Sequence, residues 1–176
     1  MINWPEAEGE GAGPGTVLVI EDDRPTRELL AAILADEDLP YQLASTGHEA
    51  MEHARRSTPA MVVLDFHLPF VRGEAVATAL RIEYGHALPI LAMSASDEKA
   101  AAQRVGAFDY VQKPFEIDDF VKKVRHGLEL AERSQSLRSS SDRARDRLQQ
   151  TMERQRQAFE ALRRIEPPES GIASGQ

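Results

Sequence analysis

The stretch Met61-Val62-Val63-Leu64-Asp65 consists of four apolar residues in a row followed by an acid. An unbroken apolar run of this kind predicts a strand covered on both faces, as in a parallel sheet flanked by helices. Similar runs recur at residues 17–20, 41–44, 89–93 and 108–111, of which 41–44 is the weakest. We therefore expect five buried strands.

Segments with helical spacing separate these runs. The first has Pro25 in its opening turn, where proline is favoured, and an apolar stripe of Leu29, Leu30, Ile33 and Leu34. Further helices are expected at 47–56, 73–84 and 97–105, and a fifth from residue 117. Strict alternation of strand and helix predicts βαβ crossovers. The predicted fold is α/β and flavodoxin-like, a doubly wound five-stranded parallel sheet of order 2-1-3-4-5 with five helices.

The composition narrows the class of protein. It is 41% hydrophobic and 28% charged, with no cysteine, which excludes disulfides and zinc–thiolate sites. No apolar run is long enough to span a bilayer, so we expect a cytoplasmic protein without a membrane partner. Residues 1–126 hold 12 Lys and Arg against 21 Asp and Glu, whereas residues 127–176 hold 9 against 8. An acidic body argues against direct DNA binding, because phosphate neutralisation needs a basic surface.

Polar residues follow four of the five predicted strands, at the sheet edge where ligands bind in open α/β folds. They are Glu21, Asp22 and Asp23 after the first strand, Asp65 after the third, Ser94 after the fourth and Lys113 after the fifth. Singly, three of them have a plain structural explanation: Asp23 is equally well a helix cap, Ser94 a turn residue and Lys113 a surface charge. Asp65 is harder to explain in this way, because it emerges from a buried strand, where an unpaired charge is costly. Together they place carboxylates, a hydroxyl and an ammonium at one edge.

These residue types suit metal-assisted phosphoryl transfer. Clustered carboxylates without cysteine select a hard cation, and Mg²⁺ favours one or two carboxylates together with water and phosphate oxygens. A carboxylate beside such a metal can attack phosphorus and form an aspartyl phosphate. We expect Lys113 to neutralise charge and the Ser94 hydroxyl to hold a phosphoryl oxygen.

Four motifs in order carry a resemblance to the receiver domain of two-component response regulators. They are residues 17–23 (VLVIEDD), 62–69 (VVLDFHLP), 93–95 (MSA) and 110–115 (YVQKPF), and the resemblance covers about residues 16–130. It implies a response regulator that accepts a phosphoryl group from a sensor histidine kinase, with Mg²⁺ as cofactor, and signals by a conformational switch and partner binding. It implies no enzyme activity beyond self-phosphotransfer and autodephosphorylation.

The resemblance also assigns a role to each matching position. Asp65 matches the phosphoacceptor, and Asp22 the acid that binds the metal directly. Glu21, in place of the aspartate of some members, matches an acid that acts through water, and the backbone carbonyl of His67 completes the metal site.

The remaining matches concern the switch. Ser94 and Lys113 match the residues that contact the phosphoryl group, and Tyr110 matches the aromatic residue that moves inward together with the hydroxyl. Lys113–Pro114 is similar to the family's cis peptide. His67 and Ser96 lie at two variable positions that tune how fast the phosphoryl group is lost.

The chain divides into four predicted segments. Residues 1–15 are predicted to be a disordered leader, 16–132 the receiver domain, 133–166 a C-terminal helix and 167–176 a disordered tail. A seam of Leu148, Met152, Gln155, Phe159 and Leu162, spaced three and four residues apart, predicts a short coiled coil. Ser139 and Ser140 can cap a fresh helix, although one continuous helix is also compatible with the sequence.

Several functions remain open at this level. The C-terminal helix is expected to form a homodimer, with relay to a missing output domain and packing on its own domain as alternatives. The face around the fourth helix, fifth strand and fifth helix is a second possible dimer surface.

Two other functions compete with that of a response regulator. An aspartyl phosphohydrolase of the haloacid-dehalogenase type would need an acid at position 67, which is histidine. A structural adaptor in which phosphorylation is idle is the third hypothesis.

Overall fold

The computed structural model describes residues 15–163 of the 176-residue chain, without the side chains of residues 158, 159 and 161–163. The predicted leader (1–15, Gly15 excepted) and tail (167–176) lie outside the described residues. So do the side chains of Phe159 and Leu162 in the predicted seam.

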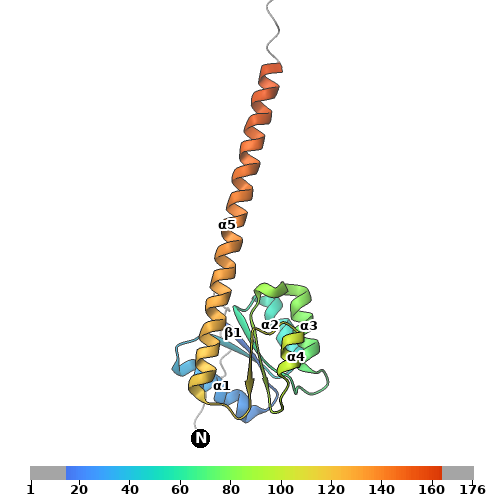
Figure 1. Ribbon diagram of the computed structural model, residues 1–176, viewed down its shortest axis with the longest axis vertical. Coiled ribbons are helices and arrows are strands. Elements are labelled where there is room, and N and C mark those ends of the chain that lie inside the picture. Colours follow the sequence, from blue (N-terminus) through green and yellow to red (C-terminus); the bar gives the residue numbers. More distant parts are fainter. Residues whose placement is uncertain (1–14, 164–176) are drawn as a thin grey trace, which may run out of the picture. The chain divides into compact units, whose positions relative to one another are not determined.

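Strands and helices alternate through the described residues (Figure 1). The strands are β1 (Val17–Ile20), β2 (Tyr41–Ala44), β3 (Met61–Asp65), β4 (Ile90–Ser94) and β5 (Asp109–Gln112). The helices are α1 (Arg24–Asp36), α2 (Gly47–Arg56), α3 (Gly73–Tyr84), α4 (Lys99–Arg104) and α5 (Ile117–Arg163), with a 3₁₀ turn η1 (Gly85–Ala87) after α3. All strand pairs are parallel and the strand order is β2-β1-β3-β4-β5, which confirms the predicted fold.

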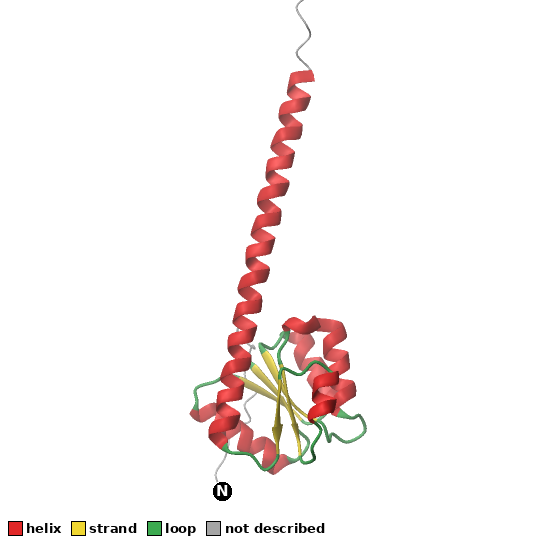
Figure 2. Ribbon diagram, viewed as in Figure 1, coloured by secondary structure: helices red, strands yellow, loops and turns green. Residues whose placement is uncertain are grey.

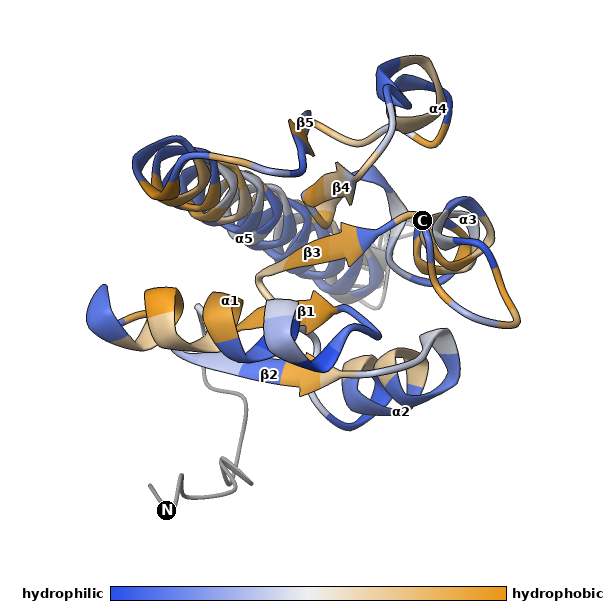
Figure 3. Ribbon diagram, turned by 90° about the horizontal axis from the view of Figure 1, so that it is seen from below, coloured by the Kyte–Doolittle hydropathy of each residue, from blue (hydrophilic) through white to orange (hydrophobic). Residues whose placement is uncertain are grey.

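Helices cover both faces of the sheet (Figures 2 and 3). Because successive strand residues point to opposite faces, Leu18 and Val62 pack with α2, α3 and α4, whereas Val19 and Val63 pack with α1 and α5. Both faces of the central strands are therefore buried. This explains why their sequences are apolar without alternation.

The ends of several elements differ from the prediction by one or two residues. β4 begins at Ile90 because Pro89 has no N–H to donate to the sheet, and it continues to Ser94, whose carbonyl accepts a hydrogen bond from Lys113 N–H at 2.8 Å. β3 likewise includes Asp65. α4 is shorter than the predicted 97–105, because Glu98 stands at its N-cap position.

α5 is one continuous helix from Ile117 to Arg163. No new helix begins at Ser139 or Ser140, so the segment predicted as a separate helix over 133–166 continues the fifth helix of the domain. The chain divides into two compact units, Met1–Gln135 and Ser136–Gln176, and α5 runs through the boundary. In the second unit Leu137, Leu148 and Met152 are exposed.

The described helices lack the features of a membrane span. None of them, α5 included, combines the length and the apolar character needed to cross a bilayer.

Candidate functional site

Three acids meet at the carboxyl ends of β1 and β3. Glu21 and Asp22 follow β1 and Asp65 is the last residue of β3, and one carboxylate oxygen of each lies within 4.8 Å of the others. Glu21 and Asp65 are only 1% and 5% exposed, whereas Asp22 faces solvent. The structure thus brings together three of the four carboxylates that the sequence places at strand ends, and Asp23 is not among them.

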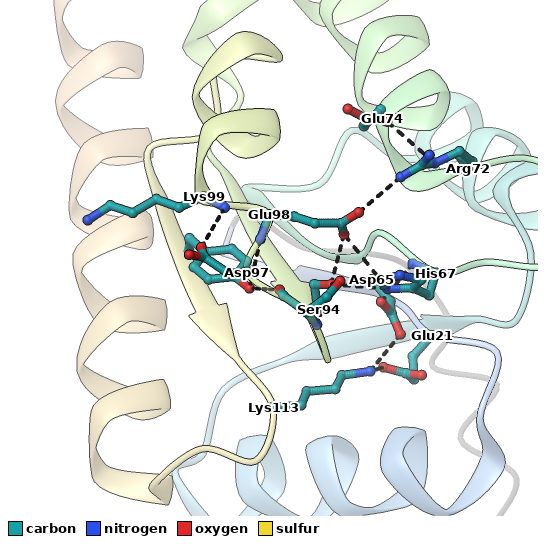
Figure 4. Close-up of polar contacts among 12 residues, drawn as sticks. Glu21, Asp65, His67, Arg72, Glu74, Ser94, Asp97, Glu98, Lys99 and Lys113 are labelled. Carbon is teal, nitrogen blue, oxygen red and sulfur yellow. Dashed lines mark hydrogen bonds and ion pairs between the residues drawn. The ribbon is translucent and has the colours of Figure 1, made fainter.

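Lys113 joins the two buried acids (Figure 4). Its Nζ lies 2.6 Å from Glu21 Oε2 and 2.6 Å from Asp65 Oδ2. Burial raises the pKa of Glu21 to about 7; the hydrogen bond from Lys113 opposes this rise, and the Asp65 charge adds to it. Burial alone would lower the pKa of Lys113, but its bonds to Asp65 and Glu21 outweigh that effect and raise it.

The second oxygen of Asp65 is held by the chain that follows it. His67 N–H donates to Asp65 Oδ1 at 2.9 Å, which places the His67 main chain beside the carboxylate. Gly73 then closes the loop, with its N–H bonded to the Phe66 carbonyl. A Cβ at Gly73 would lie 2.3 Å from the Asp65 carbonyl oxygen, so only glycine fits this approach of α3 to β3.

Arg27, in α1, supports the acidic loop, which consists of residues 21–23 after β1. Its Nη1 donates to the backbone carbonyls of Glu21 at 2.7 Å and Asp22 at 3.0 Å. This role of Arg27 is not apparent from the sequence, because a bond from a side chain to backbone leaves no pattern of residue types. Asp23 behaves as a helix cap, accepting from Thr26 N–H at 3.0 Å, and its bonds to Thr26 lower its pKa.

Ser94 is fully buried at the end of β4. Its Oγ donates to Glu98 Oε2 at 2.8 Å, lies 3.0 Å from His67 Nδ1, and accepts from Ser96 N–H at 3.2 Å. The family resemblance assigns a role only to the main chain of His67, and the contact of its imidazole ring with Ser94 is seen only in the structure.

Tyr110 in β5 contacts the segment between β4 and α4, which contains Ser96 and Glu98. Its hydroxyl donates to the Ser96 carbonyl and accepts from Glu98 N–H at 3.4 Å. Tyr110 and Ser94, the two predicted switch residues, are therefore linked through the β4–α4 segment. The predicted cis peptide at Lys113–Pro114 is confirmed.

Glu98 and Arg72 form a second charged group beside Ser94 (Figure 4). Arg72 Nη2 lies 2.9 Å from Glu98 Oε1, and Arg72 also pairs with Glu74. Sequence reasoning missed both residues. Acids before a helix are usually caps, and the Arg72–Glu98 pair joins residues 26 positions apart, which only the fold reveals.

The donor set fits a hard divalent cation. The three clustered acids offer only oxygen ligands, and burial has left Glu21 with a pKa of about 7, so Lys113 does not fully compensate the two buried carboxylates. Oxygen ligands of this kind suit Mg²⁺. Asp22 and Asp65 would hold the ion, with Glu21 beside them.

A doubly wound parallel sheet with acids, a hydroxyl and an ammonium at its carboxyl edge fits a receiver-type signalling domain. The family model described as "Response regulator receiver domain" matches residues 17–125, and the chain belongs to this family.

Curated relatives agree with this assignment. The chain is 37% identical to the response regulator MprA of Mycobacterium leprae over 112 residues, which are 62% of this chain and 49% of that protein. It is 33% identical to the transcriptional regulatory protein PcoR of Escherichia coli over 112 residues, 62% and 49% of the two chains. The chain thus spans about half the length of these relatives.

Among solved structures, a putative response regulator from Chloroflexus aurantiacus J-10-fl matches with a TM-score of 0.63 and 30% identity, covering 66% of this chain and 99% of the other. The receiver domain of NtrX from Brucella abortus matches with a TM-score of 0.61 and 28% identity, covering 64% and 98%. These matches confirm the receiver fold.

Proposed function

We propose that this protein accepts a phosphoryl group on Asp65 from a sensor histidine kinase and passes the signal to partners through a conformational switch. The observation that carries the proposal is the setting of the Asp65 carboxylate. One of its oxygens is bonded to His67 N–H and the other to the Lys113 ammonium, beside a carboxylate cluster suited to Mg²⁺. Family membership supports the same chemistry.

The proposed transfer forms a bond between an Asp65 oxygen and phosphorus while the bond from phosphorus to the donor, a histidine nitrogen, breaks. The donor nitrogen keeps the electron pair of the broken bond. Lys113 is close enough to both buried acids to offset the negative charge that gathers as the phosphoryl group arrives. Asp22, Asp65 and the His67 carbonyl would hold a bound Mg²⁺, and Glu21 would contact it through water. The ion would further neutralise the charge on the phosphoryl oxygens.

The switch would involve Ser94 and Tyr110. A phosphoryl group adds a near-dianion with acceptor oxygens, and it favours whichever packing of the β4–α4 segment brings donors to it. Because both side chains contact that segment, a movement of Ser94 would also change the contacts of Tyr110. Partners would then recognise the altered surface.

The test is phosphorylation by a small-molecule donor. Incubation with acetyl phosphate and Mg²⁺ should add one phosphate, seen by intact-mass spectrometry, and the Asp65→Asn variant should gain none. Labelling of the variant equal to that of the wild type would refute the assignment. Steady turnover of a generic phosphate ester would instead favour the phosphohydrolase, although we propose that the protein is not an enzyme in that sense.

α5 is proposed to pair two copies of the chain in the cytoplasm. Its exposed Leu148 and Met152 are four residues apart and begin the predicted seam. The alternative is relay to an output domain, which is favoured by the relatives being about twice as long as the matched segment. Light scattering with and without beryllofluoride separates a phosphorylation-dependent dimer from an adaptor whose pairing is constant. Direct DNA binding is not expected of residues 1–126, because they are acidic.

A further inference from the structure

The hydrogen and both lone pairs of the Ser94 hydroxyl already face partners in the fold. A serine hydroxyl offers one hydrogen and two lone pairs. Because an ionised carboxylate only accepts, the single hydrogen goes to Glu98 Oε2 at 2.8 Å. The lone pairs then face Ser96 N–H at 3.2 Å, His67 Nδ1 at 3.0 Å and Ser96 Oγ at 3.4 Å, and a hydrogen on Nδ1 or on that Oγ would be donated to Ser94.

Glu98 is itself held in place. Its side chain is 16% exposed, and its other oxygen, Oε1, binds Arg72 Nη2 at 2.9 Å. Its backbone N–H donates to the Tyr110 hydroxyl. One residue thus contacts both predicted switch side chains, and Arg72 fixes it from the loop after β3 (Figure 4).

We propose that Glu98 is a positioning residue that competes with the phosphoryl group for the single Ser94 hydrogen. The idea rests on the proposed function. Phosphoryl oxygens, like the Glu98 carboxylate, are acceptors, and one hydrogen cannot serve both strongly. Ser94 must therefore leave Glu98 before it can bind the phosphoryl group. Glu98 stabilises the unphosphorylated arrangement and so sets how readily the switch responds.

The experiment measures the affinity for beryllofluoride, a phosphoryl mimic, in the presence of Mg²⁺ by titration calorimetry. Glu98→Ala should bind about tenfold more tightly than the wild type, the order of change expected when a hydrogen bond to a charged group no longer has to be given up. Glu98→Gln, which keeps a neutral acceptor, should lie between the two. Thermal unfolding of each variant verifies that it is folded.

Two further variants separate competition from a general structural effect. Glu74→Gln is the matched control, because Glu74 pairs with Arg72 and Arg104 but does not contact Ser94, and its affinity should equal that of the wild type. In a Ser94→Ala background, Glu98→Ala should change the affinity less than about twofold, since the contested hydrogen is gone.

The outcomes separate a failure of the proposed function from a failure of the role of Glu98. A wild type that binds no beryllofluoride would overturn the proposed function and the role of Glu98 with it. Wild-type binding with no gain in Glu98→Ala, or with the same gain after Ser94→Ala, would overturn the role of Glu98 alone.

Discussion

Replacing Glu21 by glutamine should stabilise the metal-free protein at alkaline pH. Burial raises the pKa of Glu21 from 4.5 to about 7. At about 1.4 kcal/mol for each pH unit, this rise corresponds to a cost of roughly 3 to 4 kcal/mol for ionising the group in the fold. Between pH 4.5 and about pH 7, Glu21 keeps its proton in the folded chain but has lost it in the unfolded chain. The free energy of unfolding of the wild type therefore falls as the pH rises through this range. Glutamine has the same shape and does not ionise.

The assay is urea unfolding of wild type and Glu21→Gln in a chelator, at several pH values from about 4 to 8. The two should be nearly equally stable near pH 4, and the variant should gain roughly 3 kcal/mol by pH 8. Added Mg²⁺ should narrow the difference, because the cation offsets the buried charge. Glu28→Gln is the control, since Glu28 is exposed on α1 and pairs only with Arg24 among the described side chains. A variant less stable than the wild type at pH 8, or a gain independent of pH, would show that the buried Glu21 charge does not destabilise the fold.

Four other changes have defined outcomes. Arg27→Ala should weaken Mg²⁺ binding about tenfold in calorimetry, because two carbonyl bonds that fix the acidic loop are lost; unchanged affinity would contradict this. Arg81→Met should cost about 2 to 3 kcal/mol in urea unfolding, since the Arg81 guanidinium bonds four backbone carbonyls between α3 and β5; a loss below about 0.5 kcal/mol would disagree. Gly73→Ala should destabilise the domain and slow labelling by acetyl phosphate, because its Cβ meets the Asp65 backbone; wild-type rates and stability would show that the loop yields. Leu148→Glu combined with Met152→Glu should give a monomer in light scattering, and a dimer unaffected by both changes would place the pairing surface elsewhere.

The fold was readable from the sequence because its pattern is locally consistent. Runs such as 61–65 have to be strands covered on both faces, and their alternation with helices leaves few topologies. Element ends were less certain, because they depend on single bonds: β4 gains Ser94 through the Lys113 N–H, which no local pattern announces. Likewise Ser139 and Ser140 read equally well as a cap and as the interior of a long helix, and the structure has the latter.

The candidate site was predictable to the extent that topology alone gathers it. Glu21, Asp22, Asp65, Ser94 and Lys113 lie at strand ends, and a parallel sheet brings those ends to one edge. Their identities also carry recognisable chemistry.

The supporting residues could not be found in that way. Arg27 and Arg81 bond to backbone carbonyls, which every residue type provides. Glu98 and Arg72 meet only because the β3–α3 and β4–α4 loops lie side by side in the fold. The same is true of the His67 ring, whose contact with Ser94 joins the ends of two different strands.

Locating the modified residue tests whether Asp65 carries the phosphoryl group. The protein is incubated with acetyl phosphate and Mg²⁺, reduced with borohydride, which converts an aspartyl phosphate to homoserine, and sequenced by tandem mass spectrometry. Homoserine at position 65, and its disappearance when Mg²⁺ is chelated, is the expected result. Homoserine at position 22 in place of position 65 would show that Asp65 is not the phosphoacceptor.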